Sequence, residues 1–408
     1  MPALQRNLKL YAIHQIAFQA FFWFPIFFLY YLEIITLKQA LFVDAFYYLC
    51  VVLLEVPSGY FADRFGRKLT LLISSISLFA AYLCFYTASS FSMFLIAKIF
   101  FAIAFSFSSG ADTSFFYSSL ESLGKQSEYG DREANIQKWS AYVGAGSALI
   151  GGFCGSYLGL KSAYLLSMLA ALVCVVCSSL FVEPSHKKEQ VEHTLAKQIN
   201  KCLSYLKHPL ILWLSAFMVL MTILNHIPYE FYQQYIDLLH IEQITSDQRT
   251  PITTGILAAA MNIFAAYFSG KSMKISRRIG VKSFFLSVVS AQTIIITCMA
   301  YFLEWWVLVP IILYRVPARI LSAPFNQCLA PEIQNEHRST FLSLISLGSR
   351  LAYGLTLMGL TSIVPHNSTG EWAQLSKILQ VSSFLGLSGL LVLYYSSGRT
   401  RLESRQTS

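Results

Sequence analysis

The chain has 408 residues, of which 55% are hydrophobic, 15% are aromatic and only 12% are charged. Because a soluble domain carries about 25% charged residues, this composition excludes an ordinary soluble protein and indicates a chain that lies in a lipid bilayer. A net charge of +9 would suggest nucleic acid as the partner of a soluble protein, but here the lysines and arginines lie between apolar segments. We therefore expect a lipid surface, and no nucleic acid, around them.

Long apolar segments recur along the whole chain. A helix that spans a bilayer needs about 20 mostly apolar residues, and twelve segments meet this requirement. In chain order they cover residues 9–32, 38–58, 69–89, 92–118, 136–157, 161–182, 209–235, 252–270, 282–303, 305–326, 340–364 and 374–396. The sequence therefore predicts an all-α integral membrane protein with twelve transmembrane helices, whose two ends lie on the same side of the membrane.

Lysines and arginines are distributed unequally between the two sides of this arrangement. The side that holds both termini carries 22 of them, and the other side carries 4. Since short basic segments stay in the cytoplasm, both termini are predicted to be cytoplasmic. The first apolar segment is too long and too aromatic for a cleavable signal peptide. We expect a multi-pass protein of a bacterial inner membrane.

The stretch from Leu53 to Leu72, LLEVPSGYFADRFGRKLTLL, lies between the second and third predicted helices. Its polar residues follow the spacing G-x-x-x-D-R-x-G-R-K, which resembles the loop between helices 2 and 3 in the major facilitator superfamily of transporters. The resemblance implies two six-helix bundles related as pseudo-repeats, which rock to open the protein to each side in turn. It also implies a gating role for Gly59, Asp63, Arg64, Gly66, Arg67 and Lys68.

Two interpretations of this stretch make different predictions. If it gates, the glycines let neighbouring backbone come close, and replacement of Asp63 by Asn is expected to stop transport while the protein stays in the membrane. If it is an ordinary solvated loop that only fixes orientation, the same replacement leaves the transport rate unchanged. A transport assay on the Asp63→Asn variant distinguishes the two.

A polar segment divides the chain almost in half. Residues Glu183 to His208 form the longest charged stretch, which predicts an N-terminal bundle over residues 1–182, a cytoplasmic linker over 183–208 and a C-terminal bundle over 209–408. A faint repeat supports the duplication, since GKSMKISRRIGVK (Gly270–Lys282) is again basic and bounded by glycine.

Helix 4 of the prediction contains a lysine, Lys98. A charge near the centre of a membrane helix costs about 2.5–3.5 kcal/mol or more, so Lys98 is expected to face a cavity or a carboxylate, or to reach the outer surface with its long side chain. Transporters of the resembling family often have an Arg followed by glycine here, linked to proton movement. Lys98 and Ala102 depart from that pattern.

Three carboxylates lie within or near the apolar segments of the first half. Asp44 on helix 2 is the expected partner of Arg350 on helix 11, because the resemblance makes these helices neighbours. Glu55 and Asp112 both lie toward the cytoplasmic third, in strings that resemble a bacterial branch of the superfamily. Each either titrates during transport or ties down the basic stretch.

Helix 5 contains the glycine-rich string GAGSALIGGFCG. Drug exporters of the superfamily carry a Gly- and Pro-containing motif at this place, although the Gly-Pro pair itself is replaced here by Ser147 and Ala148. The glycines indicate either this exporter motif or only a close contact between helices. The helix-packing residues are Gly144, Gly151, Gly152 and Gly155.

The second half places charged residues within three apolar segments. Arg315 and Arg319 on helix 10 lie one turn apart and therefore share a face, which would suit an anionic cargo. His226 and Glu230 lie on helix 7. The histidine either titrates near neutral pH or is a hydrogen-bonded structural residue.

No nucleotide-binding motif is present, so we expect transport to be powered by an ion gradient, most simply protons through Asp112, Asp44 or Glu230. The predicted function is a monomeric antiporter for efflux of a small organic molecule, without cofactor or metal. Cys174 and Cys177 have CxxC spacing but lie within an apolar helix, which disfavours a metal site. A proton-coupled importer of a nutrient or metal chelate, and a non-transporting receptor of the same fold, are the alternatives. No nucleophile–base or metal constellation indicates an enzyme.

Overall fold

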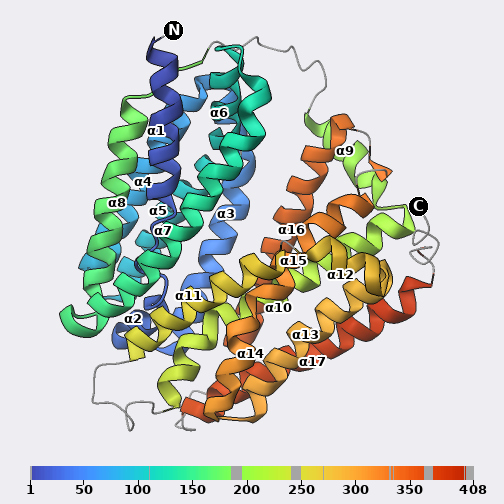
Figure 1. The fold of residues 1–408 in the computed structure, drawn as a ribbon. Coiled ribbons are helices and arrows are strands. Elements are labelled where there is room, and N and C mark those ends of the chain that lie inside the picture. Colours follow the sequence, from blue (N-terminus) through green and yellow to red (C-terminus); the bar gives the residue numbers. More distant parts are fainter. Residues whose placement is uncertain are drawn as a thin grey trace. The chain divides into compact units, whose positions relative to one another are not determined.

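The computed structural model describes residues 2–109, 111–184, 195–239, 250–269, 271–329, 332–333, 335–362, 371–398 and 400. All regular structure in this part of the chain is helical, which confirms the all-α prediction. Ten of the helices described there are long and apolar enough to cross a membrane. The helices form two compact units (Figure 1), namely unit 1 (Met1–Glu189 and Glu242–Ala259) and unit 2 (Gln190–Ile241 and Ala260–Ser408).

Unit 1 is a helical bundle with a densely aromatic interior. Its helices are α1 (Pro2–Phe18), α2 (Phe27–Ile34), α3 (Leu37–Phe65), α4 (Arg67–Thr87), α5 (Phe91–Ser108), α6 (Ala111–Glu121), α7 (Tyr129–Leu158), α8 (Lys161–Ser179) and residues 250–259 of α11 (Thr250–Ser269), with a short 3₁₀ turn η1 (Gln126–Glu128). Helix α4 packs against α5 and α8, and α3 packs against α5. Tyr30, Tyr82, Phe85 and Tyr164 are almost fully buried between them.

Unit 2 repeats this organisation with different helices. They are α9 (Leu195–Tyr205), α10 (Pro209–Leu238), the remainder of α11, α12 (Ser272–Ile279), α13 (Val281–Tyr301), η3 (Trp305–Val307), α14 (Leu308–Leu313), α15 (Arg315–Leu329), α16 (Asn335–Thr361) and α17 (Glu371–Ser397). Helix α10 packs against α16 and α17, and α13 packs along α17 (Figure 1). The three-part division predicted from the sequence stays a prediction.

The first predicted span, residues 9–32, is not one continuous helix. Helix α1 ends at Phe18 and α2 begins at Phe27, with turns in between. Pro25 explains the break, because a proline has no N–H and collides with the carbonyl four residues before it. The backbone of the break is still hydrogen-bonded: Phe24 N–H donates to Phe21 O, and Trp23 N–H donates to the Ser167 hydroxyl. A non-helical segment inside a membrane protein needs such internal partners.

The predicted span 305–326 is also divided, into η3, α14 and α15. Helix α7 is long but begins with the polar run YGDREANIQK, and it is not among the ten apolar helices. The number of twelve spans therefore remains a prediction.

Candidate functional site

Unit 1 holds a buried ion pair between two of its helices. Lys98 Nζ on α5 lies 2.5 Å from Asp44 Oδ1 on α3, and the two residues are only 5% and 3% exposed. Aromatic rings surround the ammonium group at 4.9–5.9 Å from their centroids, namely those of Tyr31, Tyr47, Phe85 and Phe101. Both charges are thus removed from water and depend on each other.

This pair corrects two expectations. Asp44 was expected to pair with Arg350, but its partner is Lys98. The alternative in which Lys98 extends to the outer surface is wrong as well, since the side chain is buried. The energetic argument that a membrane lysine seeks a carboxylate was sound. The residue types alone do not show that α3 packs on α5, and this packing decides which carboxylate Lys98 meets.

Asp112 and Glu55, the other two candidate carboxylates of unit 1, accept hydrogen bonds from uncharged groups. Gln15 on α1 donates to Asp112 Oδ2 at 2.9 Å, and the Thr113 backbone N–H donates to Asp112 Oδ1. Ser109 donates to Glu55 Oε1 at 3.3 Å. The question whether either carboxylate titrates during transport stays open as a prediction.

His14 on α1 is a further buried polar residue of unit 1. Its Nε2 lies 3.0 Å from the Ser75 hydroxyl, which itself donates to the carbonyl of Leu71. The hydroxyl proton is therefore used, and Nε2 of His14 must be the donor to Ser75. His14 holds α1 against α4.

The stretch between the second and third predicted helices contains almost no loop, contrary to expectation. Helix α3 continues through Gly59, Asp63 and Arg64 to Phe65, and α4 begins at Arg67. The turn is made by Gly66 alone, whose φ of 97° lies in the region that glycine favours over other residues. The side chain of Asp63 lies outside the described part of the chain.

The cations of this stretch are held by groups that the sequence did not single out. Arg67 donates through Nη1 to the Ser114 carbonyl and the Ser118 hydroxyl of α6. The Glu183 carboxylate accepts the backbone N–H groups of Arg67 and Lys68 at 2.9 and 2.7 Å. A carboxylate in this position satisfies the free N–H groups and the positive end of α4.

Glu183 is the first residue of the predicted linker, and its carboxylate caps a helix of unit 1. Its carboxylate lies 3.0 Å from the place where a Cβ at Gly66 would be. The residue at position 66 must therefore be small as well as tolerant of positive φ. The signal available in the sequence was a single acidic residue directly after the span that ends at residue 182.

Glu183→Ala is expected to lower the free energy of unfolding by about 0.5–2 kcal/mol, the usual cost of losing a helix N-terminal cap. The matched control is Glu121→Ala, an exposed carboxylate at the other end of a helix, which should change stability by less than about 0.5 kcal/mol. Thermal unfolding of the purified variants measures both values. Equal stability of the two variants would contradict the capping role of Glu183.

The glycines of α7 lie where backbone segments approach closely. A Cβ at Gly151 would collide with the backbone carbonyl of Phe22, in the break of the first span. A Cβ at Gly152 would collide with the carbonyl of Pro251, in the part of α11 that belongs to unit 1. Gly144 and Gly155 have looser surroundings, with their nearest atoms at 3.6 Å and 3.2 Å.

In unit 2, the predicted residues Glu230 and His226 on α10 both contact Tyr353 on α16. Tyr353 on α16 donates its hydroxyl to Glu230 Oε1 on α10 at 3.0 Å. The ring of Tyr353 lies 4.6 Å from that of His226, whose Nδ1 donates to the Thr222 carbonyl at 2.7 Å. Arg350 is half-buried and lies about one turn before Tyr353 on α16.

The two arginines of α15 differ in their surroundings. Arg315 donates through Nη1 to Asn262 Oδ1 at 2.5 Å and through Nε to the Tyr314 hydroxyl at 3.0 Å. Arg319, one turn later, is exposed. Arg315 therefore ties α15 to the part of α11 that lies in unit 2, while Arg319 remains accessible in that unit.

Arg315→Lys is expected to cost about 1.5 kcal/mol of stability, the net value of one hydrogen bond from a charged donor. A lysine keeps the charge, but its compact ammonium cannot reach two acceptors in a fixed fork as a guanidinium does. Arg319→Lys is the matched control and should be close to neutral. If thermal unfolding shows the same cost for both variants, the fork of Arg315 is not the cause.

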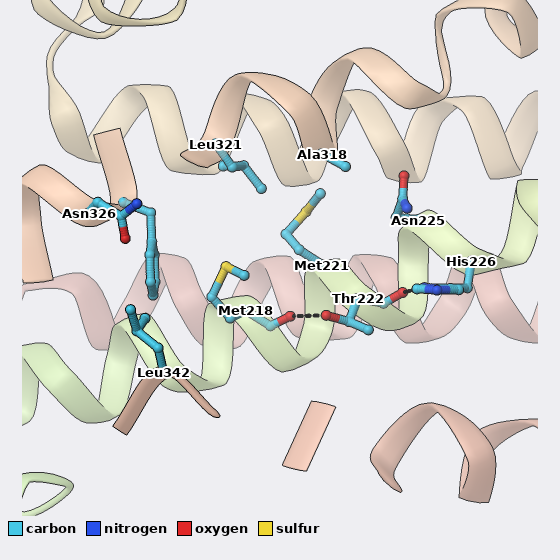
Figure 2. Close-up of a pocket in the computed structure, with 10 residues that line it drawn as sticks. Met218, Met221, Thr222, Asn225, His226, Ala318, Leu321, Asn326 and Leu342 are labelled. Atoms are coloured by element: carbon cyan, nitrogen blue, oxygen red, sulfur yellow. Dashed lines mark hydrogen bonds between the residues drawn. The ribbon is translucent and has the colours of Figure 1, made fainter. Parts of the chain in front are cut away.

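A cavity of about 280 Å³ lies beside these residues within unit 2 (Figure 2). Its apolar walls come from Met218 and Met221 on α10 and from Leu321 and Phe325 on α15, and its other lining residues are Thr222, Asn225, His226, Ala318, Asn326 and Leu342. None of these ten residues is a carboxylate. In Figure 2, Asn225 lies between Ala318 and His226.

The polar groups of this cavity include an unused hydrogen-bond acceptor. Asn225 Oδ1 is buried and accepts no hydrogen bond from the residues that the structure describes. Nδ1 of His226 donates to the Thr222 carbonyl. Such a cavity suits an uncharged molecule with an apolar body and an N–H or O–H group. Within the described part of the chain, no three His, Cys, Asp or Glu side chains gather as they would around a metal ion.

Comparison with known families decides the class of the protein. The model of the Major Facilitator Superfamily matches residues 11–357, most of the chain. The chain belongs to the major facilitator superfamily. No curated protein sequence matches it.

Solved structures of superfamily transporters share this fold. The nucleoside transporter NupG has a TM-score of 0.77 at 11% identity, with 97% of this chain and 99% of that one covered. A peptide transporter POT in complex with sulfate has a TM-score of 0.70 at 11% identity, covering 98% and 95%. A bacterial homologue of the human lysosomal transporter Spinster has a TM-score of 0.66 at 11% identity, covering 99% and 96%. At such identities the similarity shows the fold.

Membership of the major facilitator superfamily makes the chain a membrane transporter with a small-molecule cargo. The sequence had singled out Lys98, Asp44, Glu230 and Arg315. It had not paired Lys98 with Asp44, and it had not indicated the partners of Glu230 and Arg315. Asn262, Tyr353 and Asn225 were missed because a lone amide or phenol within an apolar helix gives no periodic signal. They stand out only once α10, α11, α15 and α16 are seen together.

Proposed function

We propose that this member of the superfamily is a proton-coupled antiporter that exports a small, uncharged or amphipathic organic molecule across a bacterial inner membrane. The observation that carries the proposal is the buried pair of Asp44 and Lys98 in unit 1. Within membrane segments, ionisable residues of this kind mark ion pathways and proton relays.

The coupling step follows from the geometry of this pair. A proton on Asp44 removes the negative charge that lies 2.5 Å from the Lys98 ammonium. The ammonium is then left among aromatic rings with no carboxylate, and an unpaired buried charge is costly. Protonation therefore favours a state of the protein in which Lys98 has moved, and a ligand that favours one of the two states is coupled to the proton.

The export direction is supported by α7. Exporters of the superfamily carry a Gly- and Pro-containing motif at this place. Ser147 and Ala148 replace its Gly-Pro pair here, but Gly151 and Gly152 lie against backbone carbonyls. The same proposal includes three further features. Both termini lie on the cytoplasmic side, two six-helix bundles give alternating access, and the residues from Gly59 to Lys68 act as the gate. The turn at Gly66 and the cap by Glu183 hold the proposed gating segment in one defined conformation.

The cargo is proposed from the cavity of unit 2. It is lined by methionine, leucine and phenylalanine with amide and imidazole groups, and its lining residues include no carboxylate. A cation would find no counter-charge in that wall. Asn225 Oδ1 would accept a hydrogen bond from an uncharged molecule that carries an N–H or O–H group.

Flux in proteoliposomes with an imposed pH gradient tests the proposal. The panel contains cationic, neutral and anionic organic compounds of similar size. We expect neutral compounds to move against their gradient as protons enter. Anions that move together with protons would instead establish import and make Arg315, Arg319 and Arg350 the cargo site. Binding of one compound without flux would indicate a receptor.

A further inference from the structure

The surroundings of the Lys98 ammonium have the composition of a binding site for an organic cation. Four aromatic rings lie around it, at 4.9 Å for Tyr47, 5.4 Å for Tyr31, 5.8 Å for Phe101 and 5.9 Å for Phe85. The Asp44 carboxylate completes the cage at 2.5 Å. Proteins recognise ammonium ligands with such aromatic cages.

The cage is held in place by contacts that do not involve Lys98. Phe85 stacks on Tyr164 at 5.0 Å, Tyr31 packs edge-on against Phe94 at 4.9 Å, and Phe101 packs against Phe105 at 4.8 Å. The rings come from four helices, α2, α3, α4 and α5. A site whose walls are fixed independently of their occupant can accept a different occupant.

Asp44 retains capacity for a second donor. Its Oδ1 faces Lys98, while Oδ2 is buried and receives no hydrogen bond from the described residues. A primary ammonium has three donors, and a carboxylate has two acceptor oxygens. A free ammonium ion in the cage could use both oxygens, which a lysine held by its chain does not.

We propose that this cage is a binding site for a small organic ammonium ion, and that Lys98 is its tethered occupant. Lys98 is then a specificity-determining residue, because it keeps cationic molecules out of unit 1. The exclusion of cationic cargo by Lys98 rests on the proposed transport function. The existence of the cation site does not.

Lys98→Ala opens the site for a direct measurement. The substitution removes three methylene groups and the ammonium, which together correspond to n-propylammonium. We expect the purified full-length variant to bind n-propylammonium about 30-fold more tightly than the unmodified protein does, the factor that a desolvated cation–aromatic interaction provides. Isothermal titration calorimetry gives both affinities, and n-propanol, the neutral analogue, should not bind.

Two further variants make the measurement decisive. Lys98→Ala with Asp44→Asn should lose the gain in affinity, and Lys98→Ala with Tyr47→Leu should lose several-fold of it. Lys98→Ser leaves similar space with a polar group and serves if the alanine variant does not fold. Binding of n-propylammonium no tighter than to the unmodified protein, or equal binding after Asp44→Asn, would overturn the proposal.

The transport consequence is tested separately from the site. In proteoliposomes, the Lys98→Ala variant should accept small ammonium compounds that the unmodified protein excludes. If the unmodified protein shows no proton-coupled flux but Lys98→Ala binds n-propylammonium, the proposed function fails and the cation site stands. If flux is proton-coupled but no variant binds the ion, the cation site fails alone.

Discussion

Asp44→Asn is expected to lower the free energy of unfolding by about 3–5 kcal/mol, the cost of leaving one partner of a buried ion pair without the other. The Lys98 ammonium would keep its aromatic neighbours but lose the carboxylate at 2.5 Å. With both residues about 95% or more buried, water cannot replace the lost partner. The effect should therefore exceed that of any exposed ion pair of the chain, such as Arg132 with Glu128.

The double variant Asp44→Asn with Lys98→Met distinguishes the interaction energy of the ion pair from the effect of losing either residue alone. Removing both charges together is expected to restore most of the lost stability, because apolar replacements of a whole buried pair are often neutral. A double-mutant cycle on unfolding in one detergent measures the coupling. Additive losses in the two single variants and the double variant would show that the two charges do not depend on each other.

The same substitution has a consequence for transport. If Asp44 accepts the coupled proton, as proposed, flux driven by a pH gradient should be lost in the Asp44→Asn variant. Exchange of labelled for unlabelled cargo at equal pH needs no net proton movement, so it should remain in the Asp44→Asn variant. Loss of both activities would mean that Asp44 acts in folding or cargo binding, and retention of both would remove it from the proton path.

The fold class was predictable from the sequence because the bilayer constrains composition so strongly. Long apolar segments must be helices, and the spacing from Gly59 to Lys68 indicated the family. The break of the first span was visible only as Pro25, since apolar content measures the length of a hydrophobic segment and not its continuity. The sequence therefore predicted one helix where α1 and α2 lie.

The candidate site was predictable in its residue types but not in its pairs. The cost of a buried charge pointed to a carboxylate partner for Lys98, yet Asp44, Glu55 and Asp112 were all candidates and only packing selects Asp44. Glu183 shows the opposite difficulty. A residue at the edge of a polar stretch appears solvated in the sequence, and its role as the cap of α4 depends on a turn 115 or more residues earlier.

Gly151→Ala is expected to destabilise unit 1, while Gly146→Ala in the same helix is not. A Cβ at Gly151 would collide with the backbone of Phe22, whereas a Cβ at Gly146 meets nothing within 4 Å. Replacing glycine by alanine within a helix normally stabilises it by about 1 kcal/mol, and overpacking costs about 1–3 kcal/mol. Because the propensity gain applies to both positions of α7, the two alanine variants should differ by the overpacking cost alone, about 1–3 kcal/mol.

The size of this difference depends on whether Phe22 can move aside. The chain there is not helical, but the next residue, Trp23, donates its backbone N–H to Ser167 and its indole N–H to the Tyr82 hydroxyl at 2.9 Å. A shift of Phe22 would distort both hydrogen bonds, so moving the segment aside costs free energy. Thermal unfolding of the two variants in the same detergent measures the difference. Equal melting temperatures would show that the non-helical segment around Phe22 can move away from a Cβ at position 151. Glycine would then not be required where this segment packs against α7.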